Sequence, residues 1–338
     1  MTLLSDITSL EAVAALAETL PAADAGAINA ATERQNSLTK PMGALGRLEE
    51  LAIFMAGWQE TDRPSIKRAQ AVVFAGNHGV CAQGVNPFPQ EVTAQMVANF
   101  EHGGAAINQL CRANGADLSV IAIDLETPTN DITQGAAMSE AETLDAMRRG
   151  AEAVDGDASV LVLGEMGIGN STIAAALAMA AFGGDAKDWV GRGTGSDDAG
   201  VNRKVDAITR ACAANADASG LALLSAVGGR EQAAICGAVL QARALRIPVI
   251  LDGFICTAAT AALFAADPRF LDHCVVGHVS REPGHARLLD ALNKQPVLSL
   301  DMALGEGSGA AVALGILRSA LECHNGMATF AEAGVSDG

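Results

Sequence analysis

Aromatic residues are scarce in this 338-residue sequence, which has no tyrosine, two tryptophans and nine phenylalanines. Half of the residues are nevertheless hydrophobic, and alanine is prominent among them. Alanine favours helices, whereas strands favour aromatic and β-branched side chains. The composition therefore favours closely packed helices over an all-β sandwich.

Basic residues are also few: 22 lysines and arginines stand against 39 aspartates and glutamates, which gives a formal net charge of −17. Such a charge repels nucleic acid backbones and anionic membranes. We therefore expect neither nucleic acid nor a membrane as a partner. Any bound anion must be held by backbone amides and a few local cations.

Signals for metal binding, export and membrane insertion are missing as well. The seven cysteines form no CxxC pair and no HExxH motif occurs, so reduced thiols, a cytoplasmic protein and no metal site are expected. The first ten residues, MTLLSDITSL, lack the basic and apolar regions of a signal peptide. The most apolar segment, residues 254–266, is shorter than the ~20 residues that a membrane-spanning helix needs.

Strand and helix patterns alternate along most of the chain. Residues up to about 60 have the apolar period of helices, and a polar break at 61–64 follows them. Predicted strands then alternate with helical segments, at residues 71–74, 118–123, 160–163, 248–251 and 274–276. This pattern predicts an α/β fold in which helices cover both faces of a parallel sheet, with ligands at the carboxyl ends of its strands.

The glycine-rich segment 164–170 joins a predicted strand to a helix predicted from Ser171. Such a turn directs backbone N–H groups and the positive end of a helix dipole at one point, so it can hold a phosphate without a lysine. Its spacing imitates a nucleoside-triphosphate loop, but Asn170 replaces the lysine that reaches the outer phosphates. We therefore expect a monophosphate rather than ATP, and a turn with glycines that serve only packing is the alternative.

Two glutamates are candidates for catalysis. Glu306 lies between Gly305 and Gly307 among apolar neighbours, where partial desolvation would raise its pKa toward that of a general base. A solvated or helix-capping glutamate is the alternative. Glu165, inside the predicted phosphate turn, is expected to contact a ribose hydroxyl or a second substrate rather than the phosphate. Its alternative role is a hydrogen bond to a nearby backbone N–H.

Other side chains are candidates for binding. Lys204 and Arg192 are candidate phosphate cations, although either can simply be solvated. Phe88 and Met96 are candidate walls for an aromatic ligand, with core packing as the alternative. His78 and His278 are expected to fix their loops by local hydrogen bonds, like most such histidines.

The loop motifs together resemble one enzyme family, the nicotinate-nucleotide:dimethylbenzimidazole phosphoribosyltransferases, or CobT family. The resemblance covers residues 40–336. Its motifs are KPMGALGRLEELA (40–52), AGNHGV (75–80), GEMGIGNST (164–172), GRGTG (191–195), VGGRE (227–231), PVILDGF (248–254), GHVSREPGH (277–285) and LGEGSGAA (304–311).

The resemblance implies a Rossmann-like catalytic domain of residues 61–309, a small helical domain of residues 1–60 and 310–338, and a homodimer. It implies that nicotinate mononucleotide and 5,6-dimethylbenzimidazole react without a cofactor to give α-ribazole 5′-phosphate and nicotinate, in cobalamin synthesis. Glu306 takes the position of the catalytic base and Glu165 another active-site position. The implied nucleotide site comprises Gly167, Ile168, Gly169, Asn170, Ser171, Thr172, Gly193, Thr194, Gly195, Lys204 and Ser280. The implied base pocket comprises Phe88, Met96 and Leu304, with Gly305 adjacent.

Two other function classes stay open from the sequence. An ATP- or NAD-dependent enzyme of similar fold is disfavoured, because the phosphate-binding lysine is missing and Thr172 stands where a dinucleotide fingerprint has glycine or alanine. A non-catalytic nucleotide or corrinoid sensor is compatible with the same motifs. Release of nicotinate from its mononucleotide, without metal or ATP, distinguishes these classes from the transferase.

Overall fold

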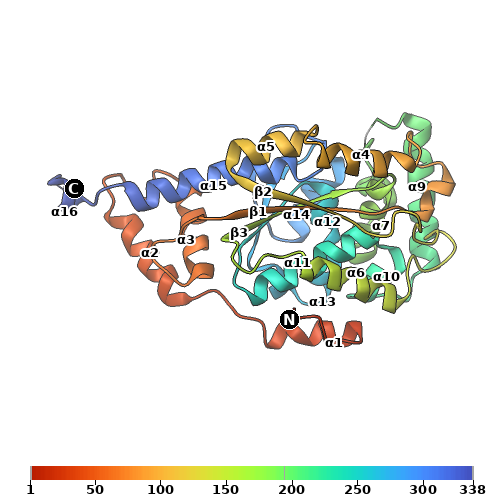
Figure 1. Cartoon of the computed structure of the whole chain (residues 1–338), viewed down its shortest axis with the longest axis horizontal. Coiled ribbons are helices and arrows are strands. Elements are labelled where there is room, and N and C mark those ends of the chain that lie inside the picture. The colour runs from red at the N-terminus through yellow and green to blue at the C-terminus, as the bar shows by residue number, and fades with distance from the viewer. Residues whose placement is uncertain (1, 194, 337–338) are drawn as a thin grey trace.

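A computed structural model describes residues 2–193 and 195–336 (Figure 1). The described residues form a sheet of six parallel strands in the order β2-β1-β3-β4-β5-β6. The strands are β1 (Ala69–Ala75), β2 (Ala116–Ala122), β3 (Val160–Met166), β4 (Val249–Leu251), β5 (Cys274–Val279) and β6 (Pro296–Ser299). The predicted α/β fold with a parallel sheet is thereby confirmed.

Helices precede, connect and follow these strands. The longer ones are α2 (Ala25–Ser37), α3 (Arg47–Gln59), α4 (Glu91–Glu101), α5 (Ala106–Asn114), α6 (Glu140–Glu152), α7 (Asn170–Phe182), α9 (Asp198–Ala214), α11 (Arg230–Ala244), α14 (Pro283–Ala291) and α15 (Ser308–Gly326). The shorter ones are α1 (Leu10–Ala14), α8 (Ala186–Trp189), α10 (Ala222–Val227), α12 (Phe254–Ala259), α13 (Ala261–Ala266) and α16 (Phe330–Ala333). No described helix combines the length and the apolar character needed to cross a bilayer.

Helices cover both faces of the sheet, and successive residues of a strand point to opposite faces. In β1, Val72 and Phe74 join a core shared with α6, α7 and α11, whereas Ala71 and Val73 join a second core shared with α3, α5 and α15. All seven residues of β1 are buried. A central strand covered on both sides thus reads as a continuous apolar run.

The strand order places a crevice beside β1. The chain moves outward from β1 to β2 and then returns to the other side of β1 to form β3. The two strands end together, since Ala75 pairs with Met166 and the Gly76 N–H donates to the Met166 carbonyl at 3.0 Å. Ligands of doubly wound sheets bind at such a reversal point, outside the carboxyl ends of the strands.

The two chain ends meet at one end of the molecule. Figure 1 shows α2 and α3 beside the far end of α15, where α15 extends past the sheet. Arg34 Nε donates to the His324 carbonyl at 2.7 Å, and Gln35 Nε2 lies 2.9 Å from His324 Nδ1. Helix α1 lies elsewhere, against α6, where the Leu10 N–H donates to Glu140 Oε1 at 2.7 Å.

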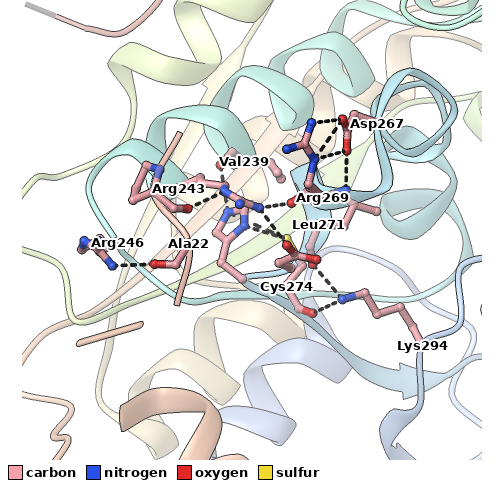
Figure 2. A network of polar contacts seen from close by, with 12 residues as sticks. Ala22, Val239, Arg243, Arg246, Asp267, Arg269, Leu271, Cys274 and Lys294 are labelled. Carbon is pink, nitrogen blue, oxygen red and sulfur yellow. Dashed lines mark hydrogen bonds and ion pairs between the residues drawn. The ribbon is translucent and has the colours of Figure 1, made fainter. Parts of the chain in front are cut away.

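An arginine pair fixes the segment between α1 and α2. Arg243 Nε donates to the Pro21 carbonyl at 3.0 Å, and Arg246 Nη1 donates to the Ala22 carbonyl at 2.8 Å (Figure 2). The Arg243 guanidinium also lies over the Trp58 ring, 5.2 Å from its centroid. The segment therefore follows a defined path from α1 to α2.

Candidate active site

A cleft opens at the carboxyl ends of the strands. The segments following β3, β4 and β5 contribute to it, together with the loops before α4 and α15. The lining comprises Val85, Asn86, Pro87, Phe88, Glu165, Met166, Gly167, Ile168, Gly169, Asn170, Ser171, Gly193, Lys204, Asp252, Gly253, Phe254, Ile255, His278, Ser280, Glu282, Ala303, Leu304, Gly305 and Glu306. It lies where the strand order predicts a ligand site.

The glycine-rich turn leads from β3 into α7 at this cleft. Gly169 has φ +92, a left-handed conformation that favours glycine, and it is the residue before the first turn of α7. Beside the turn, Lys204 Nζ donates to Ser171 Oγ at 3.1 Å and to the Gly191 carbonyl at 3.4 Å. A helix N-terminus and a lysine at one place can hold a phosphate monoester.

Burial affects the Lys204 charge. Desolvation lowers the pKa of the ammonium, while the nearby Glu282 carboxylate raises it. The sequence predicted Lys204 as a phosphate cation, and the structure places it in the cleft. Arg192, the other candidate cation, instead pairs with Asp198.

Glu306 lies in a left-handed turn with φ +65, between Gly305 and Gly307 with φ +85 and +83. Strand β3 packs directly against this turn, because a Cβ added at Gly164 would lie 2.4 Å from the Gly307 nitrogen. From the end of β4, Asp252 Oδ2 accepts a hydrogen bond from the Gly307 N–H at 3.1 Å. Two strands thus fix the backbone that carries Glu306.

The Glu306 side chain is 6% exposed, yet it lines the cleft. Burial raises the pKa of its carboxyl, and the Asp252 charge raises it further, while a hydrogen bond with the Ile107 backbone lowers it. Oε2 is buried without a hydrogen-bond partner among the described residues. A partly desolvated carboxylate with a free oxygen in a cleft is suited to accept a proton from a ligand.

Glu165 is buried in the wall of the same cleft and accepts a hydrogen bond from Asn170 Nδ2. Burial raises the pKa of Glu165 well above its ordinary value, and the carboxylates of Asp252, Glu231 and Glu306 act in the same direction. Asn170, which replaces the lysine of a triphosphate loop, therefore faces a carboxyl group. Two carboxyls with different surroundings are a common arrangement in acid–base catalysis.

The lining of the cleft also includes apolar side chains. Phe88 and Leu304 line the cleft and are 46% and 51% exposed. Ile168, Phe254 and Ile255 are further apolar residues of the lining. These side chains offer a planar heterocycle contact area in the cleft.

Most of the predicted site residues meet in the cleft, and a few do not. Outside its lining, Met96 of α4 packs against the second core, Thr172 is fully buried in α7, and Gly195 lies by a neighbouring depression next to Ser196. Thr194 lies outside the described residues. Those in the lining are Phe88, Glu165, Gly167, Ile168, Gly169, Asn170, Ser171, Gly193, Lys204, Ser280, Leu304, Gly305 and Glu306.

His278 belongs to the lining of the cleft, and His78 does not. His78 is fully buried, with Nε2 at 3.2 Å from Glu231 Oε1, and His278 Nε2 lies 3.6 Å from Asp252 Oδ1. Both contacts join different segments rather than one loop. Across the described residues, no group of His, Cys, Asp and Glu side chains has a metal-binding arrangement.

Sequence reasoning gave no role to Asp252 or Glu282, which both lie in the cleft. Asp252 directly follows β4, and Glu282 follows β5. The available signal was a polar residue just after a parallel strand, the position where ligand-binding groups gather.

Comparison with known proteins identifies close relatives. The model of a family described as "Phosphoribosyltransferase" matches residues 20–335. Nicotinate-nucleotide–dimethylbenzimidazole phosphoribosyltransferase of Rhodobacter capsulatus is 64% identical over 330 residues, which are 98% of this chain and 99% of the relative. The enzyme of that name from Ruegeria pomeroyi is 58% identical over 99% of this chain and 100% of its own length. The crystal structure of CobT from Thermus thermophilus is similar with a TM-score of 0.86, at 40% identity, and the match covers 93% of this chain and 100% of that one.

Proposed function

The chain belongs to this phosphoribosyltransferase family, and we propose that it transfers the phosphoribosyl group of nicotinate mononucleotide to 5,6-dimethylbenzimidazole or a related base. The products are α-ribazole 5′-phosphate and nicotinate. The observation that carries this proposal is a single cleft whose lining includes Glu306 with a free carboxylate oxygen, the apolar side chains of Phe88 and Leu304, and the glycine-rich turn before α7.

In this proposal the substrates divide the cleft between them. The 5′-phosphate binds at the N-terminus of α7 with Lys204 and Ser171, and the incoming base contacts Phe88 and Leu304. Binding the phosphate, which does not react, orients the anomeric carbon C1′ toward the base.

The chemistry needs one base and no acid. The pyridinium nitrogen of nicotinate mononucleotide is already positive, so the electron pair of its bond to C1′ leaves with a neutral ring nitrogen. One benzimidazole nitrogen bonds to C1′ from the opposite face, which turns the β-linkage into an α-linkage. The proton on the other nitrogen passes to Glu306, whose raised pKa suits this role.

Glu165 has a second role in this proposal. Because its pKa lies well above the ordinary value, we assign it a protonated carboxyl that donates a hydrogen bond to the ribose or to the second substrate. Protonation also avoids placing two charged carboxylates beside each other in the cleft.

The assembly of the protein is likewise proposed. We assign α2, α3 and the end of α15 to a small helical domain within residues 1–60 and 310–338, with 61–309 as the catalytic domain. We also propose a homodimer, which is supported by the exposed apolar side chains of Met42 and Leu300, at 79% and 55% exposure. The seven free cysteine thiols suit the reducing cytoplasm.

A direct assay tests the reaction. Purified protein is incubated with nicotinate mononucleotide and 5,6-dimethylbenzimidazole in a buffer free of metal and ATP. We expect nicotinate and α-ribazole 5′-phosphate to form in equal amounts. If correctly folded protein forms neither product, this transferase function is excluded.

A further inference from the structure

Glu282 lies at the phosphate end of the cleft. Its Oε1 accepts a hydrogen bond from the Gly193 N–H at 3.0 Å. A Cβ added at Gly193 would be 3.0 Å from both Lys204 Nζ and Ser171 Oγ, so these groups converge on one place. The lysine and the backbone N–H that suit a phosphate are therefore next to a carboxylate.

The second oxygen of Glu282 has no hydrogen-bond partner among the described residues and is buried. A Cβ added at Gly191 would be only 1.8 Å from this Oε2, and the following residue is Pro283, which starts α14. The loop thus encloses the carboxylate closely on one side. The Glu282 carboxylate therefore cannot rotate toward residue 191 when an anion binds.

The neighbours of Glu282 determine its charge. Lys204 from α9, Arg281 beside it in the chain and the Gly193 N–H stabilise the carboxylate, whereas burial opposes them and raises the pKa. The His285 ring, from α14, faces Ser280 instead, and Arg192 of the adjoining loop faces Asp198. An incoming phosphate adds negative charge at the same place, which favours protonation of Glu282.

We propose that Glu282 occupies the anion position of the free protein, and that the nucleotide phosphate binds there together with one proton, which Glu282 takes up. The protonated carboxyl then donates its O–H to a phosphate oxygen, and Lys204 and the Gly193 N–H pass to the phosphate. The nucleotide phosphate thus binds only when Glu282 is protonated. This inference rests on the proposed function for the nucleotide and for the position of its phosphate beside Lys204.

Titration calorimetry tests the proton uptake. Nicotinate mononucleotide is titrated into the full-length protein at pH 7 to 8.5, in buffers of different ionisation enthalpy. This range lies above the second phosphate pKa of about 6, so the ligand itself contributes little. We expect uptake of up to one proton per nucleotide, and a Kd that rises by at most about tenfold per pH unit.

Variants and a second ligand locate the proton. Glu282→Gln removes the titrating group but keeps an acceptor for Gly193, so we expect no uptake, a Kd that is flat with pH, and tighter binding than wild type at pH 8.5. Asp290→Asn, which removes an exposed charge on α14, the helix that follows Glu282, is the control and should behave like wild type. Nicotinate riboside, which lacks the phosphate, should bind wild type without uptake, a comparison that does not depend on any variant folding.

The outcomes separate the two proposals. Nucleotide binding and turnover without proton uptake by wild type would overturn this inference and leave the transferase function standing. Equal uptake by wild type and Glu282→Gln would also overturn it. A protein that binds no nicotinate mononucleotide at all would contradict both proposals.

Discussion

The carboxylate of Asp252 accepts a hydrogen bond from the backbone N–H of Gly307 at 3.1 Å, one residue after Glu306. Its other oxygen accepts from the Ala310 N–H at 2.9 Å, in the first turn of α15. Burial raises the pKa of Asp252 to about 6, although these N–H groups oppose the shift. The end of β4 and the start of α15 are thereby joined around the proposed base.

Replacing Asp252 by Asn should affect both stability and turnover. Asn has one oxygen that accepts hydrogen bonds, whereas the two carboxylate oxygens of Asp252 accept from the N–H groups of Gly307 and Ala310. One of these buried N–H groups therefore loses its partner in the variant, which lowers the free energy of unfolding by about 1–3 kcal/mol. We expect a lower free energy of unfolding in urea and a lower kcat. The control is Asp290→Asn at an exposed position of α14. A stable Asp252→Asn enzyme with wild-type kcat would show that Asp252 does not position Glu306.

Glu306→Gln should bind both substrates and turn over very slowly. The amide has nearly the shape of the carboxylate but cannot take the benzimidazole proton, and loss of a general base typically costs about 10²- to 10⁴-fold. Single-turnover rates and separate dissociation constants for each substrate measure the two effects. Glu322→Gln, at an exposed position of α15, the helix that follows Glu306, is the matched control. Turnover within a few-fold of wild type would transfer the base role to another residue.

Turnover should increase with pH through the pKa of Glu306. The carboxyl accepts a proton only when it is ionised, and burial places its pKa above the ordinary value of 4.5, so the rising limb of kcat/KM should lie above pH 4.5. The Asp252 charge contributes to that shift. Asp252→Asn should therefore move the rising limb to lower pH. A pH profile that is identical in both enzymes would contradict the coupling of the two carboxyls.

The sequence allowed most of the fold to be predicted because buried parallel strands are short apolar runs between helical patterns. Strand β6 was missed. It has four residues, starts with a proline and is at best half-buried at the sheet edge, so no apolar run marks it. The short helix α10 was missed for a similar reason, since six residues give too little of a helical period.

The candidate site residues that the sequence indicated belong to local patterns. Glu165, Glu306 and the turn before α7 lie next to glycines in their own loops, which the sequence displays directly. Asp252 acts on Gly307 from 55 residues away, and Glu282 acts on Gly193 from 89 residues away. Such contacts arise only when the sheet brings the strand ends together, so no local pattern indicates them.

Phe88 and Met96 should respond differently to truncation, because only Phe88 lines the cleft. Phe88→Ala removes a ring that contacts the proposed base, so we expect KM for dimethylbenzimidazole to rise several-fold with little change in stability. Met96→Ala should lower the free energy of unfolding by about 1 kcal/mol, since its side chain is partly buried against the core, and leave that KM unchanged. Steady-state kinetics and urea unfolding of both variants make the comparison. If Met96→Ala raises this KM and Phe88→Ala does not, Met96 rather than Phe88 contacts the base.

Gly164→Ala tests whether β3 positions the turn that carries Glu306. The added Cβ would lie 2.4 Å from the Gly307 nitrogen and 2.6 Å from the Glu306 carbonyl carbon, so the two backbones must separate. Overpacking of this kind costs about 1–3 kcal/mol, and a displacement of about 1 Å at a catalytic group can cost about 100-fold in rate. We expect a moderate loss of unfolding free energy and a much larger loss of kcat than of substrate affinity. Gly156→Ala is the matched control, because a Cβ there meets nothing within 4 Å. Wild-type kcat in a folded Gly164→Ala enzyme would mean that catalysis does not depend on where β3 holds the Glu306 turn.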